Sequence, residues 1–196
     1  MTGVQTCALP IYKMSEELFV SQSAPTLAGI KTGNLFTAEF VNHEIAMDEI
    51  RQLNVSLTPK GVRVIPLRES KNRMLIYVYR PNCLQVDFTN EDLLEMLRNL
   101  KYPVSNPERC IVCLAQRLRE CEVFPHEIGL FLGYPPEDVK GFIENKAQNY
   151  KIVGTWKVYG DEREAEKRFN RFRKCTADYC MRMEKGSTLD KLAVAL

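Results

Sequence analysis

Residues 63–80 read RVIPLRESKNRMLIYVYR and carry the clearest strand signals in the chain. Two runs rich in β-branched, aromatic and other apolar residues flank the polar segment RESKN, residues 68–72. Because a connection this short cannot contain a crossover helix, the pattern favours an antiparallel hairpin. A further strand is expected at LFTAEF, residues 35–40, and an amphipathic helix capped by Asn42 at residues 42–57. The first half therefore predicts a small antiparallel sheet of about three strands with a helix packed on it.

The second half of the chain has mainly helical patterns. The segment TNEDLLEMLRNL has Thr89 as a candidate N-cap, and NPERCIVCLAQRLREC has Pro107 in the first turn of its helix. A short strand or extended piece is expected at TWKVYGD, residues 155–161, followed by a long charged helix over residues 161–185. Strands in the first half and helices in the second are typical of the α+β class, which is the fold that we predict.

The first eleven residues, MTGVQTCALPI, differ in character from the rest of the chain. They carry no charge, and a secretory signal is not indicated because no basic residue precedes their short apolar part. Back-translated from a GTG start, they yield a nucleotide sequence that resembles a sequencing-library adapter. We therefore expect residues 1–11 to be an artefact and Met14 to be the native start. Residues 12–196 are expected to form a single α+β domain, with a sheet-containing half at 12–88 and a mainly helical half at 89–196.

Charge and hydropathy restrict the classes of partner. The chain contains 27 Lys and Arg residues against 25 Asp and Glu residues, a net charge of +2. A balance this close to neutral lacks the basic footprint of a nucleic-acid-binding protein, so a nucleic-acid partner is not expected. No run approaches the roughly 18 consecutive apolar residues of a membrane span, so no membrane association is expected either.

Six cysteines lie outside the first eleven residues. Without an export signal, they favour free thiols in a reducing cytoplasm over a disulfide framework. Two pairs have a spacing that zinc ligands use, namely Cys110 with Cys113 and Cys175 with Cys180. The first pair lies in a predicted helix, without the glycine-bearing turn that usually presents two thiolates to one metal. We therefore predict no metal site and keep these four cysteines as a lesser alternative.

His126 and Glu127 are the candidate catalytic residues. Histidine is the side chain that titrates unassisted near neutral pH, so His126 is suited to acid–base chemistry. Adjacent residues of a helix point about 100° apart, which prevents both from facing one small substrate from mid-helix. A structural alternative stays open, in which His126 caps a helix after Pro125 and Glu127 lies at the positive end of the helix dipole.

The surrounding segment FPHEIGLFLGYPPEDVKGFIENK, residues 124–146, predicts two short helices around a tight turn, as in a DNA-binding helix-turn-helix. Its second helix would face phosphate with three acids and two lysines, which are Glu137, Asp138, Glu144, Lys140 and Lys146. Since acids at this place repel DNA, an ordinary pair of packed helices is the favoured interpretation.

The segment GTWKVYGD, residues 154–161, is a candidate ligand-binding strand. Alternation along a strand puts Trp156 and Val158 on one face and Lys157 and Tyr159 on the other. A face with a lysine and a tyrosine suits an anionic or aromatic ligand. A solvated edge strand has the same pattern, so the structural alternative stays open.

The segments APTLAGIKTGNLF, LIYVYRP, FPHEIGLFLGYPPEDVKGFIENK and WKVYGD occur together in this chain. In combination they resemble a bacterial family known as domain of unknown function 3793, over about Met14 to Leu189. The resemblance names a family without naming an activity. It implies a His-Cys pair where this chain has Gln22 and Ser23. If that pair is a catalytic thiol and its base in the family, this chain lacks it.

Several positions that match the family pattern carry side chains able to contact a ligand: Lys31, Asn34, Arg80, Trp156, Lys157, Tyr159 and Asp161. Arg80 also has a structural alternative, in which it ends its strand and pairs with a nearby acid.

We predict a cytoplasmic bacterial binding module for a small anionic ligand or a protein partner, with Lys31, Arg80 and Lys157 as anion contacts. The alternative is an enzyme that uses His126 as acid or base in a lysine-lined pocket for an anionic substrate. A helix-turn-helix regulator is a more distant alternative. The sequence identifies neither a cofactor nor a particular partner.

Overall fold

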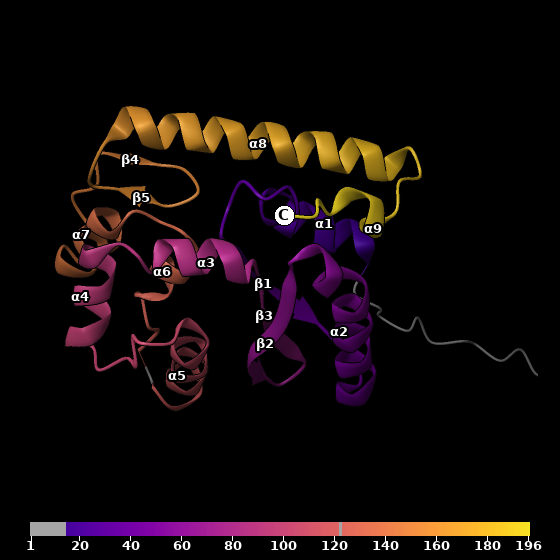
Figure 1. Ribbon diagram of the computed structural model, residues 1–196, viewed down its shortest axis with the longest axis horizontal. Coiled ribbons are helices and arrows are strands. Elements are labelled where there is room, and N and C mark those ends of the chain that lie inside the picture. Colours follow the sequence, from indigo (N-terminus) through magenta and orange to yellow (C-terminus); the bar gives the residue numbers. More distant parts are fainter. Residues whose placement is uncertain (1–14, 122) are drawn as a thin grey trace, which may run out of the picture.

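The computed structural model describes residues 15–121 and 123–196 (Figure 1). In these ranges it confirms the α+β class, with an antiparallel sheet in the first half of the chain and helices in most of the second. The predicted artefact at residues 1–11 and the predicted start at Met14 lie outside the described residues. Among the described residues, no helix is long and apolar enough to cross a membrane.

The sheet has the strand order β1-β3-β2, and its strands are β1 (Gly33–Glu39), β2 (Arg63–Ser70) and β3 (Arg73–Tyr79). The predicted hairpin is confirmed, because β2 and β3 pair in antiparallel register across a short turn. β3 is the central strand and pairs with β1 along its other edge. Both faces of this strand are covered by helices, which explains why the segment MLIYVY is apolar throughout.

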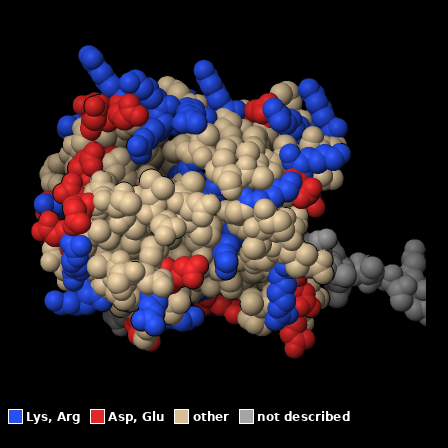
Figure 2. All heavy atoms as spheres, in the orientation of Figure 1, with Lys and Arg blue, Asp and Glu red and all other residues tan. Residues whose placement is uncertain are grey.

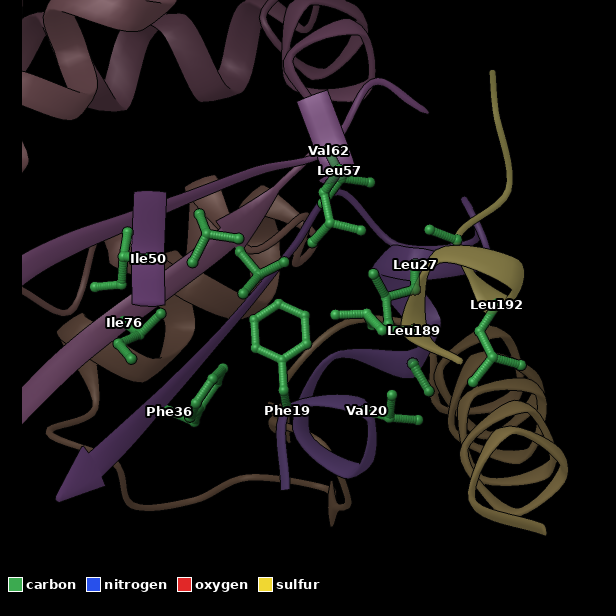
Figure 3. Packing of buried hydrophobic residues seen from close by; sticks show 14 of the residues in the cluster. Phe19, Val20, Leu27, Phe36, Ile50, Leu57, Val62, Ile76, Leu189 and Leu192 are labelled. Atoms are coloured by element: carbon green, nitrogen blue, oxygen red, sulfur yellow. The ribbon is translucent and has the colours of Figure 1, made fainter. Parts of the chain in front are cut away.

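One face of the sheet packs against helices from both ends of the chain. β3 contributes Met74, Ile76 and Val78 to this core, and the rings of Phe19 and Phe36 meet edge to face with centroids 6.0 Å apart (Figure 3). The elements on this side are α1 (Glu16–Leu27), α2 (His43–Leu57) with the following 3-10 turn η1 (Thr58–Lys60), the C-terminal part of α8 (Glu162–Glu184) and α9 (Leu189–Leu192). Segments far apart in the sequence therefore share one core.

The opposite face of the sheet carries the helices from the middle of the chain. β3 contributes Tyr77 and Tyr79, whose rings stack with centroids 4.8 Å apart, and the Tyr77 hydroxyl donates a hydrogen bond to the Phe131 carbonyl. The helices on this side are α3 (Pro81–Asp87), α4 (Glu91–Asn99), α5 (Pro107–Glu120), α6 (Ile128–Phe131) and α7 (Pro136–Glu144). Alternation along β3 thus divides the core into two layers.

Capping side chains begin several of the helices. Asn42 caps α2 as predicted. The N-cap predicted at Thr89 is wrong, because Asn90 caps α4 by accepting a hydrogen bond from the backbone N–H of Leu93 at 3.1 Å. Thr89 instead donates its hydroxyl to the Val86 carbonyl at 2.8 Å, and so belongs to the end of α3. Only three residues separate α3 from α4, so Thr89 bonds to the end of the first helix and Asn90 caps the start of the second.

The long helix α8 runs along one edge of the molecule, from the hairpin formed by β4 (Ile152–Val153) and β5 (Lys157–Val158) toward α9 (Figure 1). Near the start of the helix, Trp156 and Val158 pack against Ala165 in a small separate core. Further along, α8 packs against α1. The helix therefore connects the hairpin to the sheet-containing half.

Arg80, at the end of β3, is buried and only 1% exposed. Its guanidinium donates to the carbonyls of Thr26 at 2.6 Å, Leu27 at 2.6 Å, Lys60 at 3.0 Å and Val194 at 2.7 Å. Arg80 thus ends its strand, as in the structural alternative, but its partners are carbonyls where that alternative had an acid, and they leave little of the guanidinium for a ligand. Two of them lie at the negative end of the α1 dipole, which favours a cation. Burial nevertheless lowers the pKa of Arg80 below its usual value.

Replacing Arg80 with methionine should lower the free energy of unfolding by at least about 3 kcal/mol, because four carbonyls lose their donor at once. Urea unfolding followed by circular dichroism measures this loss. Arg73→Met is the matched control, since Arg73 is exposed and pairs with Glu39 at 2.8 Å on the surface. The control should lose about 1 kcal/mol or less. Equal losses in the two variants would contradict the role given to Arg80.

Candidate functional site

A groove lies between α1, the loop that leads into β1, the β4–β5 hairpin and α8. Its volume is about 1320 Å³. Figure 2 shows the surface hollowed below α8, with lysine and arginine side chains gathered along that helix. Of the ligand-binding residues predicted from the sequence, Lys31 and Asn34 line this groove.

The local sequence places Lys31 at the groove by ending α1 just before it. Gly29 has φ of 71°, a left-handed conformation that favours glycine, so the chain can reverse between α1 and β1. Lys31 is only 6% exposed. Its Nζ donates a hydrogen bond to the Gly33 carbonyl and lies 5.1 Å from the centroid of the Tyr134 ring. The ammonium group therefore has a carbonyl and a ring face for neighbours.

Burial lowers the pKa of the Lys31 amine from 10.5 to about 7, and no carboxylate among the described residues opposes the shift. The cause is loss of hydration, which disfavours the charged form. At neutral pH about half of the molecules therefore carry a neutral amine here and half an ammonium without a counter-ion. Lys31 is therefore unusual as a cation, because its ammonium is buried without a counter-ion, and as a base, because its amine is partly neutral near pH 7.

Other side chains give the groove a positive balance and an aromatic wall. Lys151 donates its ammonium to the Gly160 carbonyl at 2.7 Å, and Arg173 donates to the side chain of Asn170 at 2.8 Å. With Lys31 they make three cations, against the single acid Glu166 among the residues that line the groove. The rings that line it belong to Tyr150, Phe169 and Phe172. The arrangement suits a ligand with an anionic group and a flat or apolar body.

A second cavity, of about 350 Å³, shares the hairpin turn at residues 153–155 with the groove. It brings together the predicted residues His126, Trp156 and Lys157. The ring centroids of His126 and Phe142 are 4.9 Å apart. The Lys157 ammonium donates a hydrogen bond to the Ala147 carbonyl at 2.9 Å. Most other lining residues are apolar. The structure thus places Lys31 and Asn34 in the groove, and His126, Trp156 and Lys157 in the second cavity.

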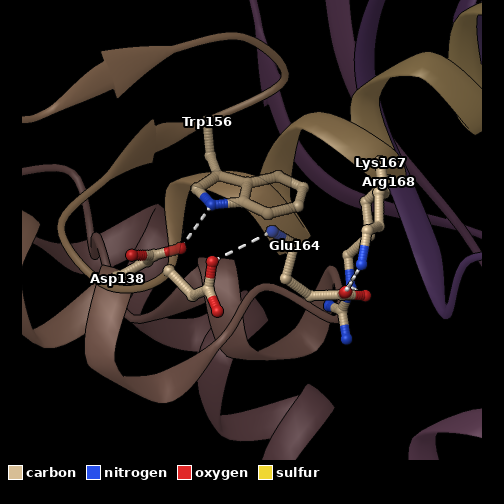
Figure 4. A network of polar contacts seen from close by, with 6 residues as sticks. Asp138, Trp156, Glu164, Lys167 and Arg168 are labelled. Atoms are coloured by element: carbon tan, nitrogen blue, oxygen red, sulfur yellow. Dashed lines mark hydrogen bonds and ion pairs between the residues drawn. The ribbon is translucent and has the colours of Figure 1, made fainter.

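Asp138 holds the hairpin between these cavities in place. Its carboxylate accepts a hydrogen bond from Trp156 Nε1 at 2.6 Å (Figure 4). It also accepts from the backbone N–H groups of Tyr159 and Gly160, both at 2.7 Å. In the helix-turn-helix alternative, Asp138 would be one of the acids that face phosphate. The structure instead places it in the interior, where it is only 3% exposed. Three donors satisfy a carboxylate well in a buried place, so its role here is structural.

Three further predicted site residues have structural partners. Glu127 is buried, accepts a hydrogen bond from the Tyr102 hydroxyl at 2.9 Å and pairs with Arg117 at 3.5 Å, so it lies against α5 rather than beside His126 in the second cavity. The Tyr159 hydroxyl donates to a backbone carbonyl at 2.8 Å. Asp161 caps α8. Adjacent or alternating positions in the sequence therefore face different surroundings.

The cysteines form no metal centre in the part of the chain that the structure describes. Cys110 and Cys113 lie on α5, whereas Cys175 and Cys180 lie on α8. Among the described residues, no group of three or more His, Cys, Asp or Glu side chains is arranged to hold a metal ion. Cys110 packs in the core instead, and burial raises the pKa of its thiol to about 11.

The two positions at which the family resemblance implies a His-Cys pair have different surroundings. Gln22 lines the groove together with Lys31. Ser23 is buried and donates its hydroxyl to the Phe19 carbonyl at 2.5 Å. A catalytic thiol at Ser23 would therefore have to act from within the core, whereas position 22 faces the same space as Lys31.

Several groove residues are not among those predicted from the sequence, above all Tyr150, Lys151, Phe169 and Arg173. One signal was present, because KRFNRFRK at residues 167–174 combines five basic residues with two phenylalanines. Both phenylalanines are partly buried, because they pack against the small core of Trp156, Val158 and Ala165 and also line the groove. A long helix can turn one side to the core and an adjoining side to a groove.

Asp138→Asn should lower the free energy of unfolding by about 2 to 4 kcal/mol, because an amide can accept fewer of the three hydrogen bonds and brings an unwanted donor. Trp156 is the one tryptophan of the chain and reports on this place by its fluorescence. Urea unfolding followed at that fluorescence measures the loss. Glu137→Gln, at the exposed neighbouring position, is the control and should change little. A loss no larger than the control's would disprove the role of Asp138.

Comparison with known proteins gives one family and no individual relative. Neither the search of curated proteins nor the search of solved structures gave a match to the chain. A family model matches residues 19–193, which include most of α1, the whole sheet, both cavities and α9. The chain therefore belongs to the family described as protein of unknown function (DUF3793).

Proposed function

We propose that the protein is a binding module for a small anionic ligand, which occupies the groove lined by Lys31. The observation that supports this most is the buried Lys31 ammonium, which no carboxylate among the described residues neutralises. The buried acids Glu127 and Asp138, by contrast, each have side-chain or backbone donors. A buried charge without a counter-ion destabilises a fold, and an anion brought by a ligand removes that cost.

The remaining groove residues indicate the kind of anion. Lys151 and Arg173 supply further cations, and a guanidinium is well suited to a carboxylate or a phosphate. The rings of Phe169 and Phe172 offer apolar surface beside them. The favoured ligand therefore combines one anionic group with an aromatic or apolar body. A concave groove suits such a small molecule better than the flat contact of a protein partner.

We also propose that the protein works in the cytoplasm of a bacterium. The six cysteines in the described ranges are free thiols, which supports a reducing compartment. The bacterial source rests on the family resemblance alone.

An enzyme remains the alternative function, because His126 and Lys157 line the same small cavity. Its support is weaker, since Glu127 is occupied by Tyr102 and Lys31 lies in the other cavity. A helix-turn-helix regulator has less support still. The first of its two helices, α6, has only four residues, and α7 turns Asp138 inward.

The stability of the unliganded protein should rise with pH between about pH 7 and 8.5, by up to about 1.4 kcal/mol per pH unit from Lys31. The Lys31 pKa is 10.5 unfolded and about 7 folded, so the unfolded chain binds more protons in this interval. At higher pH the buried thiols of Cys110 and Cys175, with pKa values raised to about 11, oppose the trend. Urea unfolding across the interval measures the slope. Lys31→Met should flatten it, and Lys174→Met, at an exposed position, should not.

Benzoate, as a simple aromatic anion, should bind at about pH 6 and bind at least about tenfold more weakly at pH 9, because only the ammonium form of Lys31 attracts it. The other titratable residues that line the groove are Tyr150, Lys151, Glu166 and Arg173. Trp156 fluorescence follows the titration, since its ring stacks on Tyr134 with centroids 4.7 Å apart.

Lys31→Met should weaken the binding of benzoate at pH 6 by about tenfold or more and remove its pH dependence. Lys174→Met, on the same helix as Arg173 but outside the groove lining, should bind like the natural chain. Binding that is equal at both pH values and in both variants would speak against the proposed function.

A further inference from the structure

The groove presents an amine as well as a cation. Lys31 lines the groove, and its buried Nζ has the Gly33 carbonyl and the face of Tyr134 as its neighbours. No acid among the described residues holds it in the protonated form. An amine that is desolvated and not ion-paired is the kind of lysine that attacks carbonyl compounds.

The reactivity of this amine at neutral pH should far exceed that of a lysine in water. An ordinary lysine is neutral in roughly one molecule in three thousand at pH 7. The Lys31 pKa of about 7 makes about half of the molecules neutral at this position. Selectivity for this lysine is therefore expected at neutral pH and should fade as the solution becomes alkaline.

We propose that Lys31 binds its ligand covalently and reversibly, as an imine with an aldehyde or ketone that also carries an anionic group. The inference rests on the proposed function, because Lys151 and Arg173 would bind the anionic group while Lys31 reacts with the carbonyl carbon. Phe169 and Phe172, which line the same groove, favour an aromatic body between the two ends.

The chemistry needs no oxidant and no second substrate. The Nζ lone pair attacks the carbonyl carbon, and the carbonyl oxygen takes up a proton to give a carbinolamine. The C–O bond then breaks, the oxygen leaves as water with the second amine hydrogen, and a C=N bond remains. When protonated, this imine keeps one N–H, which can stay hydrogen-bonded to the Gly33 carbonyl, the present acceptor of the Lys31 amine. Addition of water reverses every step.

The test uses para-carboxybenzaldehyde, which combines an aldehyde, an aromatic ring and a carboxylate. The full chain is incubated with it at about pH 7 and reduced with cyanoborohydride, and the labelled lysine is identified by peptide mass mapping. Borohydride-type reduction converts the imine to a stable secondary amine, so a transient adduct is recorded. We expect one label per chain, on Lys31, and its loss in Lys31→Met but not in Lys174→Met.

A second ligand separates this inference from the proposed function. The compound para-(hydroxymethyl)benzoate has the same ring and carboxylate but cannot form an imine. If it binds while reduction labels other lysines as readily as Lys31, the imine is disproved and anion binding stands. If neither compound binds and Lys31 stays unlabelled, both proposals fail. Mapping on the natural chain gives this answer even if Lys31→Met does not fold.

Discussion

The buried guanidinium of Arg80 is the contact on which the arrangement of the sheet-containing half depends. It joins the end of α1, the turn η1 and the chain beyond α9 through four carbonyl groups. The backbone N–H of Arg80 also donates to the Thr32 carbonyl at 2.9 Å, next to Lys31. The residue that closes this half of the fold therefore also positions the loop that lines the groove.

The buried charges of this protein differ in how they are satisfied, and that difference locates the candidate site. Arg80 has four carbonyl acceptors, and Asp138 has three donors. Lys31 has one carbonyl and a ring face. Because a buried ion needs either a counter-ion or a full set of hydrogen bonds, the shortfall at Lys31 suggests that a ligand completes it. The need to satisfy a buried charge thus stabilises the fold at Arg80 and Asp138, whereas at Lys31 the same need favours the binding of a ligand.

Local rules accounted for much of the fold. The polar connection RESKN between two apolar runs predicted the β2–β3 hairpin, and Asn42 predicted the start of α2. These features depend on neighbours in the sequence, which is why periodicity and capping preferences reveal them. Thr89 and Asn90 are adjacent and both are favoured N-cap residues, so capping preference alone could not decide which of them begins α4.

The sequence by itself determined the α+β class, the hairpin, the long helix and the presence of reactive residue types such as Lys31 and His126. Only the tertiary structure decided which charged side chains are buried and what satisfies them. Arg80, Glu127 and Asp138 resemble site residues in the sequence, yet each has its partners inside the fold. The groove joins α1, the β4–β5 hairpin and α8, which are distant along the chain. The desolvation of a charged side chain and its contacts with distant segments depend on that packing, so no local sequence pattern could predict them.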